Sequence, residues 1–288
     1  MTFLTETKFL LKTHKILPNK LKGQNFLISE QVLKKIIQVA KLKPKENILE
    51  IGPGIGTLTR ALLEQKVNPS PLLKEKKSGI NLKVIEIDKK LFQILRPLAE
   101  MNKFELIEGD ILKMNLQKIL PLKFLKNYKI VANLPYNITS RFLRIFLEHQ
   151  YPPQEMILML QKEVAERIIN KDGKWSKLSL MCNFYARPEY LFTVGKENFY
   201  PQPKVDSAVI KFNPTGASTH EVKLKRFWQL VNISFSSKRR TLANNLMAGL
   251  ELNRAEVYKI LDRAGLEKNI RAEKLNIEDW IMLVNSTK

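Results

Sequence analysis

Cysteine and histidine are scarce in this chain of 288 residues, and acidic residues are few relative to basic ones. The single cysteine, Cys182, excludes an intrachain disulfide and suits a reducing compartment, so we expect a cytoplasmic protein. The three histidines, His14, His149 and His220, lie far apart and form no ligand pattern with Cys182, so we expect no metal. No long uncharged apolar run or signal-like segment occurs, which argues against a membrane protein.

Basic residues are in large excess: 49 lysines and arginines stand against 28 aspartates and glutamates, a net charge of +21. A charge of this size favours a polyanionic partner. We expect ribosomal or other nucleic acid, with attraction to a membrane surface as the lesser alternative. The length and the 44% hydrophobic content suit one large domain and a smaller one, and we expect a monomer.

The N-terminal region carries much of this charge, because residues 1–45 contain ten lysines and two glutamates. We interpret residues 1–22 as a basic arm that contacts phosphates, with contacts that weaken steeply as salt rises. A solvated tail is the alternative. An organelle transit peptide fits less well, since the arm is rich in lysine rather than in arginine and serine.

Strand-like and helical patterns alternate over the first two thirds of the chain. Apolar strands are predicted at 47–51, 82–87, 104–107, 128–132 and 156–160, with helices after Ser29 and over 57–63, from Lys89, and over 140–150 and 162–170. Such alternation indicates a largely parallel sheet covered on both faces. Residues 66–81 resemble a flexible basic insertion, and the last third predicts four short helices at 228–235, 241–250, 254–264 and 277–284.

Two predicted strands end in groups suited to a ligand. The first runs into Gly52-Pro53-Gly54-Ile55-Gly56 and then a helix, so its backbone can approach a ligand closely and offer N–H donors. The spacing does not fit dinucleotide binding, because Thr57 stands where the third glycine belongs. At the second strand end, Glu86 is placed for a ribose and Asp88 for capping the next helix.

The fifth strand leads into Asn133-Leu134-Pro135-Tyr136. Pro135 ends the strand, because it lacks a backbone donor and restricts the residue before it to an extended conformation. Asn133 and Tyr136 then project at the carboxyl edge of the sheet, where open α/β sheets bind ligands. The alternative is an ordinary junction in which Asn133 caps a turn and Tyr136 fills the core.

Six motifs in order carry a family resemblance. They are Gly-Gln-Asn-Phe-Leu from Gly23, Glu-Ile-Gly-Pro-Gly-Ile-Gly-Thr-Leu-Thr from Glu50, Val-Ile-Glu-Ile-Asp from Val84, Gly-Asp-Ile-Leu from Gly109, Asn-Leu-Pro-Tyr-Asn-Ile-Thr-Ser from Asn133, and Phe-Tyr-Pro-Gln-Pro-Lys-Val-Asp-Ser from Phe199. Together they resemble the ribosomal RNA adenine N6,N6-dimethyltransferases from about residue 23 to the C-terminus. The run Phe-Ser-Ser-Lys-Arg-Arg-Thr-Leu-Ala-Asn-Asn-Leu from Phe235 resembles the small-subunit (KsgA-type) branch more than the large-subunit branch.

The resemblance implies a Rossmann-like class I S-adenosylmethionine-dependent methyltransferase fold, with a mostly parallel seven-stranded sheet in residues 23–214 and a small helical RNA-docking domain in 215–288. It implies S-adenosylmethionine as the cofactor, without a metal. The implied cofactor-binding residues are Asn25, Leu27, Gly52, Gly54, Glu86, Asp110, Ile111 and Asn133. The implied catalytic residues are Asn133, Leu134, Pro135, Tyr136 and Phe199, and the implied RNA-binding residues are Lys238, Arg239 and Arg240.

The chemistry of an exocyclic amine gives these residues roles. The N6 lone pair of adenine is delocalised into the ring, so acceptors such as the Asn133 side-chain oxygen and the Leu134 carbonyl must hold the N–H groups out of plane. Tyr136 then stacks on the extruded base and Phe199 covers its other face, although a core position for Phe199 is nearly as good an interpretation. Because the methyl donor is already a strong electrophile, catalysis rests on alignment and electrostatics.

The resulting hypothesis is dimethylation of N6 of two adjacent adenines in small-subunit ribosomal RNA, within a precursor particle and coupled to ribosome biogenesis. One alternative is an adenine methyltransferase acting on large-subunit RNA or DNA. Another is a non-catalytic assembly or transcription factor of the same fold.

Overall fold

The computed structural model describes residues 2–19, 23–64, 79–215 and 224–287, and these form two compact units. The first unit is Met1–Ala165 with Glu189–Pro214, and the second is Glu166–Pro188 with Thr215–Lys288. One division falls after residue 214, and the domain bounds expected from the sequence remain a prediction. Glu166–Pro188, however, groups with the C-terminal part, because Leu180 and Phe184 belong to the same apolar core as Phe227.

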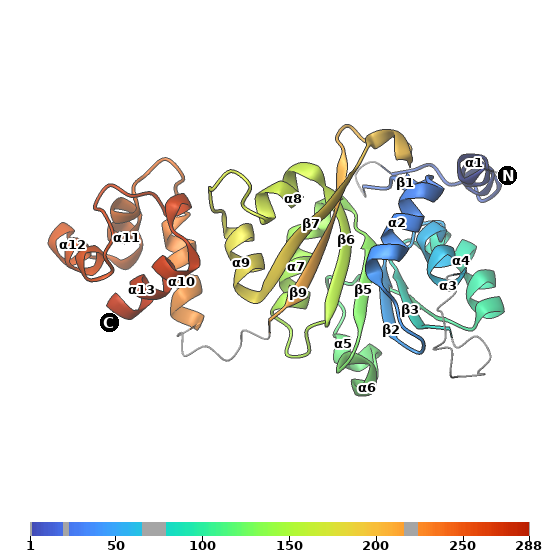
Figure 1. Ribbon diagram of the computed structural model, residues 1–288, viewed down its shortest axis with the longest axis horizontal. Helices are drawn as coiled ribbons and strands as arrows, with labels where there is room; N and C mark the ends of the chain where they lie inside the picture. Colours follow the sequence, from blue (N-terminus) through green and yellow to red (C-terminus); the bar gives the residue numbers. More distant parts are fainter. Residues whose placement is uncertain (1, 20–22, 65–78, 216–223, 288) are drawn as a thin grey trace. The chain divides into compact units, whose positions relative to one another are not determined.

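The first unit is built on a seven-stranded sheet (Figure 1). The first five strands in sheet order are parallel, and the sixth pairs antiparallel with the fifth. All five predicted strands are present within a residue or two, which confirms the mostly parallel sheet. In sheet order the strands are β4 (Glu105–Glu108), β3 (Asn81–Glu86), β2 (Asn47–Ile51), β5 (Lys129–Asn133), β6 (Glu155–Gln161), β9 (Ser207–Pro214) and β7 (Ala186–Val194).

The central strands are buried on both faces, as their continuous apolar runs predict. Val131 of β5 and Ile157 of β6 pack on one face with Leu33, while their strand neighbours Ile130 and Leu158 are equally buried on the other. The helices of this unit are α1 (Phe3–Thr13), α2 (Glu30–Ala40), α3 (Thr57–Glu64), α4 (Lys89–Asn102), α5 (Leu116–Ile119), α6 (Leu122–Leu125) and α7 (Thr139–Leu147), and α8 (Lys162–Ile168) crosses into the second unit.

The N-terminal region differs from the expected arm, because Phe3–Thr13 form a packed helix. Phe3, Thr7 and Leu11 recur every four residues and face inward, and Leu11 and Ile16 pack against Phe26. The lysines of this helix stay exposed, so phosphate contacts remain a prediction. Most of the predicted 66–81 insertion lies outside the described residues.

A short two-stranded ribbon fixes the segment that follows. Strand β1 (Phe26–Leu27) pairs antiparallel with β8 (Phe199–Tyr200), so Leu27 lies opposite Phe199. This pairing brings the start of the predicted cofactor motif to the segment that precedes β9.

The second unit is helical and holds the four predicted helices, α10 (Leu224–Ser234), α11 (Leu242–Leu250), α12 (Arg254–Arg263) and α13 (Ile277–Ser286). A helix that the sequence did not reveal, α9 (Lys177–Tyr185), joins them and buries Cys182. Its Phe184 ring lies 4.8 Å from that of Phe227, centroid to centroid. None of the helices in the described part of the chain is both long and apolar enough to cross a membrane.

Candidate active site

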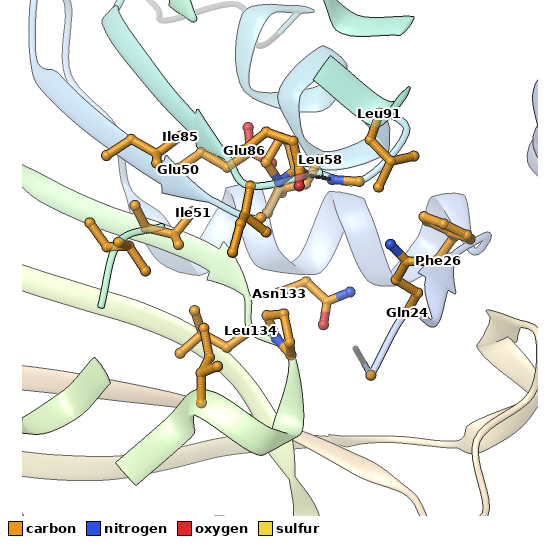
Figure 2. Close-up of a pocket in the computed structure, with 18 of the residues that line it drawn as sticks. Gln24, Phe26, Glu50, Ile51, Leu58, Ile85, Glu86, Leu91, Asn133 and Leu134 are labelled. Carbon is orange, nitrogen blue, oxygen red and sulfur yellow. Dashed lines mark hydrogen bonds between the residues drawn. The ribbon is translucent and has the colours of Figure 1, made fainter. Parts of the chain in front are cut away.

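A cavity opens at the carboxyl edge of the sheet, between the ends of β2, β3, β4 and β5 and the segment around β1. Figure 2 shows Glu86 and Asn133 on opposite sides of it, with Gln24 and Phe26 from the N-terminal segment closing a third side. The cavity collects most of the predicted site residues, namely Asn25, Leu27, Gly52, Gly54, Glu86, Asp110, Ile111, Asn133, Leu134, Pro135 and Tyr136. Phe199 is not among its lining residues.

The glycine turn after β2 forms the floor of the cavity. Gly52 and Gly54 have φ angles of +63° and +64°, the left-handed region where a side chain is strained. A Cβ on Gly54 would also lie 3.0 Å from the Phe26 ring. The turn therefore lets the backbone come close to a ligand, as the sequence predicted.

Glu86 ends β3 and is almost fully buried at the cavity wall. Its two carboxyl oxygens accept hydrogen bonds from the backbone N–H groups of Asp88 at 2.8 Å and Gly54 at 3.3 Å. Burial raises the pKa of Glu86 to about 7, although these two hydrogen bonds oppose the shift. Each oxygen keeps a lone pair for a ligand. Asp88 caps α4 by accepting from the Lys90 N–H, as predicted.

Glu50, a second buried carboxyl in the lining, was not singled out from the sequence. It lies within β2, and neither of its oxygens has a hydrogen-bond partner among the described residues. Burial raises the pKa of Glu50 to about 8; the Thr59 hydroxyl opposes this shift and the nearby Glu86 carboxylate adds to it. A glutamate inside an otherwise apolar strand was the signal in the sequence, because a buried acid without a partner is costly.

The end of β4 supplies a mixed polar and apolar wall. The carboxylate of Asp110 accepts a hydrogen bond from the Leu112 N–H at 3.0 Å and lies 3.8 Å from the ammonium of Lys113. Ile111 is buried beside it, and Ile85 and Leu91 add apolar surface to the lining. This wall can therefore bind a flat ring, whose face would contact the apolar side chains and whose polar edge would meet the Asp110 carboxylate.

The opposite wall is formed by the end of β5. The Asn133 side-chain N–H₂ group donates to the backbone carbonyl of Asn25 at 3.4 Å, and Leu134 N–H donates to Met159 at 3.2 Å. Leu134 is buried and Pro135 begins the 3₁₀ turn Tyr136–Ile138. Because its amide nitrogen is engaged, Asn133 leaves its side-chain oxygen to accept a hydrogen bond from a ligand.

Tyr136 lines the cavity with a half-buried ring. Its hydroxyl shares a 2.8 Å hydrogen bond with the hydroxyl of Ser207, the first residue of β9. Burial raises the pKa of Tyr136, and the Asp206 carboxylate adds to this effect while Ser207 opposes it. The phenol therefore stays protonated. The predicted second aromatic, Phe199, is instead 3% exposed and packs in the apolar core with Leu27.

The basic turn of the second unit lies where the sequence placed it. Lys238, Arg239 and Arg240 are exposed in the turn just before α11. Asn245, buried in α11, holds the start of this turn because its N–H₂ group donates to the carbonyls of Ser234 at 2.6 Å and Ser237 at 3.1 Å. Sequence reasoning missed Asn245, since an asparagine inside a helix gives no sign of its partners.

Among the described residues, no three histidine, cysteine or acidic side chains lie together as metal ligands would. The fold and the strand-end groups around this cavity define a class I methyltransferase. Within that class, the chain belongs to the ribosomal RNA adenine dimethylase family, whose model matches residues 17–288.

Relatives of known identity agree with this assignment. Ribosomal RNA small subunit methyltransferase A of Dehalococcoides mccartyi is 37% identical over 284 residues, which cover 98% of this chain and 92% of that protein. The crystal structure of a dimethyladenosine transferase from Plasmodium falciparum is similar with a TM-score of 0.72 and 25% identity, over 90% of this chain and 95% of that one. The crystal structure of the 23S rRNA methyltransferase ErmE is similar with a TM-score of 0.67 and 25% identity, over 91% of this chain and 99% of that one.

Proposed function

We propose that this protein uses S-adenosylmethionine to dimethylate N6 of two adjacent adenines in small-subunit ribosomal RNA. The observation that carries the proposal is a single cavity with carboxylates on one side and the Asn133–Tyr136 turn on the other. The curated relative named for the small subunit supports that substrate over large-subunit RNA or DNA. An intact set of site residues speaks against a non-catalytic factor.

The residues of the cavity fit S-adenosylmethionine. Near neutral pH the buried carboxyl of Glu50 is mostly protonated and that of Glu86 partly so, and a cofactor with a net positive charge would favour the ionised form of both. Glu86 has lone pairs left for the ribose hydroxyls, and Asp110 can accept from the adenine amino group. Asn25, Leu27 and the Gly52–Gly54 turn would hold the methionine end.

The opposite wall would hold the target amine. The Asn133 oxygen and the Leu134 carbonyl would accept its N–H groups and turn its lone pair toward the cofactor. When bound, the cofactor supplies an electrophilic methyl group, so the new C–N bond forms as the S–C bond breaks and the amine proton leaves to solvent. Tyr136 would stack on the base, an interaction worth about 1–3 kcal/mol. The chain therefore contributes mainly alignment.

The partner in this proposal is ribosomal RNA within a small-subunit precursor particle in the cytoplasm, bound by a monomer. Lys238, Arg239 and Arg240 would contact its phosphates. Their position at the start of α11 supports this, because three cations at a helix N-terminus are unfavourable unless an anion neutralises them. The net charge of +21 supports it too.

The decisive experiment offers three substrates to the purified protein with radiolabelled S-adenosylmethionine: unmethylated small-subunit particles, large-subunit RNA and duplex DNA. Wild type should label only the particles, and mass spectrometry of the nucleosides should find N6,N6-dimethyladenosine. Asn133→Ala should lose at least about a hundredfold in rate, because the amine is no longer oriented. Asn102→Ala, at the surface end of α4, is the matched control and should behave as wild type. Label on DNA alone would refute the substrate, and full activity in Asn133→Ala would refute the mechanism.

A further inference from the structure

The hydroxyl of Tyr136 has a specific partner in a different motif, at Ser207. The 2.8 Å hydrogen bond to Ser207 joins residues that are 71 positions apart in the chain. Tyr136 is also one of the residues that line the cavity. A residue that borders the cavity is thus fixed to the sheet at its far end.

Ser207 is a rigid anchor. It is fully buried and pairs with Gln161 in the antiparallel ladder between β9 and β6. The preceding residue, Asp206, is held by two hydrogen bonds. Its backbone carbonyl accepts from the Lys162 N–H at 3.0 Å, and its side-chain carboxylate accepts from the Lys196 N–H at 3.1 Å. The Ser207 hydroxyl therefore occupies a defined position beside the Tyr136 hydroxyl.

A tether at the hydroxyl restrains the position of the whole ring. A hydrogen bond at the far end of a tyrosine side chain restricts χ1, because χ1 moves the phenol oxygen, and it biases χ2, because the phenol O–H prefers to lie in the ring plane. Without it, the ring keeps its apolar face but samples other orientations. An aromatic ring that stacks on a base binds it more tightly when the ring is already fixed in the free protein, because no side-chain conformational entropy is then lost on binding.

We propose that Ser207 is a positioning residue that orients the Tyr136 ring for the target adenine, and that this matters most for the second methyl transfer. The inference rests on the proposed function. After the first transfer, N6 carries a methyl group and has one N–H left to guide it. The base is then held more by stacking and less by hydrogen bonds. If the Tyr136 ring is not held in place, the monomethylated base can therefore dissociate before the second methyl transfer.

The test compares Ser207→Ala, Tyr136→Phe, the double variant and Ser207→Thr on unmethylated small-subunit particles. Ser207→Ala and Tyr136→Phe each break the tether from one side and should lower kcat by about three- to tenfold, the range expected for one neutral hydrogen bond. KM for the particle and the dissociation constant for S-adenosylmethionine should change by less than about twofold. The fraction of monomethylated adenine should rise, the double variant should be no worse than either single one, and Ser207→Thr should restore the dimethylated product.

Ser234→Ala is the control, because it removes a buried serine hydroxyl in the second unit. It should leave kcat and the product ratio at wild-type values. The tether is refuted if Ser207→Ala and Tyr136→Phe both keep wild-type kcat and product ratio, or if their effects add in the double variant. Tyr136→Phe keeps the test decisive if the changes at Ser207 disturb β9. If wild type labels another nucleic acid instead, the proposed substrate fails, and the same comparison on that substrate still decides the tether.

Discussion

Replacing Glu50 by glutamine tests whether the cavity at the sheet edge holds a carboxyl that resists ionisation. Its pKa is about 8 in the folded protein, against 4.5 for an ordinary glutamate. At a pH between these two pKa values, the Glu50 carboxyl is ionised in the unfolded chain but stays protonated in the folded chain. Rising pH therefore favours the unfolded state, by up to about 1.4 kcal/mol per pH unit.

From pH 5 to pH 8 we expect Glu50 to lower the free energy of unfolding of the wild-type protein by about 2–4 kcal/mol. Glu86 acts in the same direction as pH rises toward 7, so Glu50→Gln should reduce the slope without abolishing it. S-adenosylmethionine should restore more stability to wild type than to the variant at pH 8, because its positive charge compensates the ionised Glu50.

Hydrogen exchange at the β2 amides, measured at both pH values, reports on the unit that holds Glu50. Tryptophan fluorescence in urea gives an internal control, since Trp175, Trp228 and Trp280 all lie in the second unit. Glu100→Gln, at an exposed position of α4, controls for the loss of one carboxyl group. The same pH slope in wild type and Glu50→Gln would refute the reasoning.

Three further predictions follow from the site and its surroundings. Changing Lys238, Arg239 and Arg240 together to alanine should weaken particle binding and lower the slope of log affinity against log salt by about two, measured by filter binding; an unchanged slope would mean that they contact only solvent. Asn245→Ala should destabilise the second unit by about 2 kcal/mol in fluorescence-monitored urea melts, because a buried carbonyl and a partly buried one lose their donor, and a change below about 0.5 kcal/mol would contradict this. Phe199→Leu should cost about 1–2 kcal/mol of stability with kcat within about twofold of wild type, and a tenfold loss of kcat at unchanged stability would restore its predicted stacking role.

Much of the site followed from the sequence because its residues sit at the ends of parallel strands. The carboxyl ends of such strands meet at one edge of the sheet, so Glu86, Asp110 and Asn133 could be placed together before their contacts were known. Local chemistry was equally readable: Asp88 caps α4, and the glycines after β2 adopt positive φ.

What the sequence missed depends on partners distant in the chain. Phe199 belongs to a motif that suggested stacking, yet its pairing opposite Leu27 turns it into the core. Helix α9 joins the C-terminal unit through Phe184, and its pattern alone did not reveal that.

The sequence by itself determined the parallel sheet, the positions of the polar residues at the strand ends and the membership of the family. These features can be predicted because periodicity, glycine turns and short motifs each involve only a few neighbouring residues. Only the tertiary structure decided that Glu50 is buried with no hydrogen-bond partner among the described residues and that the Tyr136 hydroxyl is bonded to Ser207. Burial and side-chain pairing are set by which surfaces pack together, and that choice is made between segments tens of residues apart.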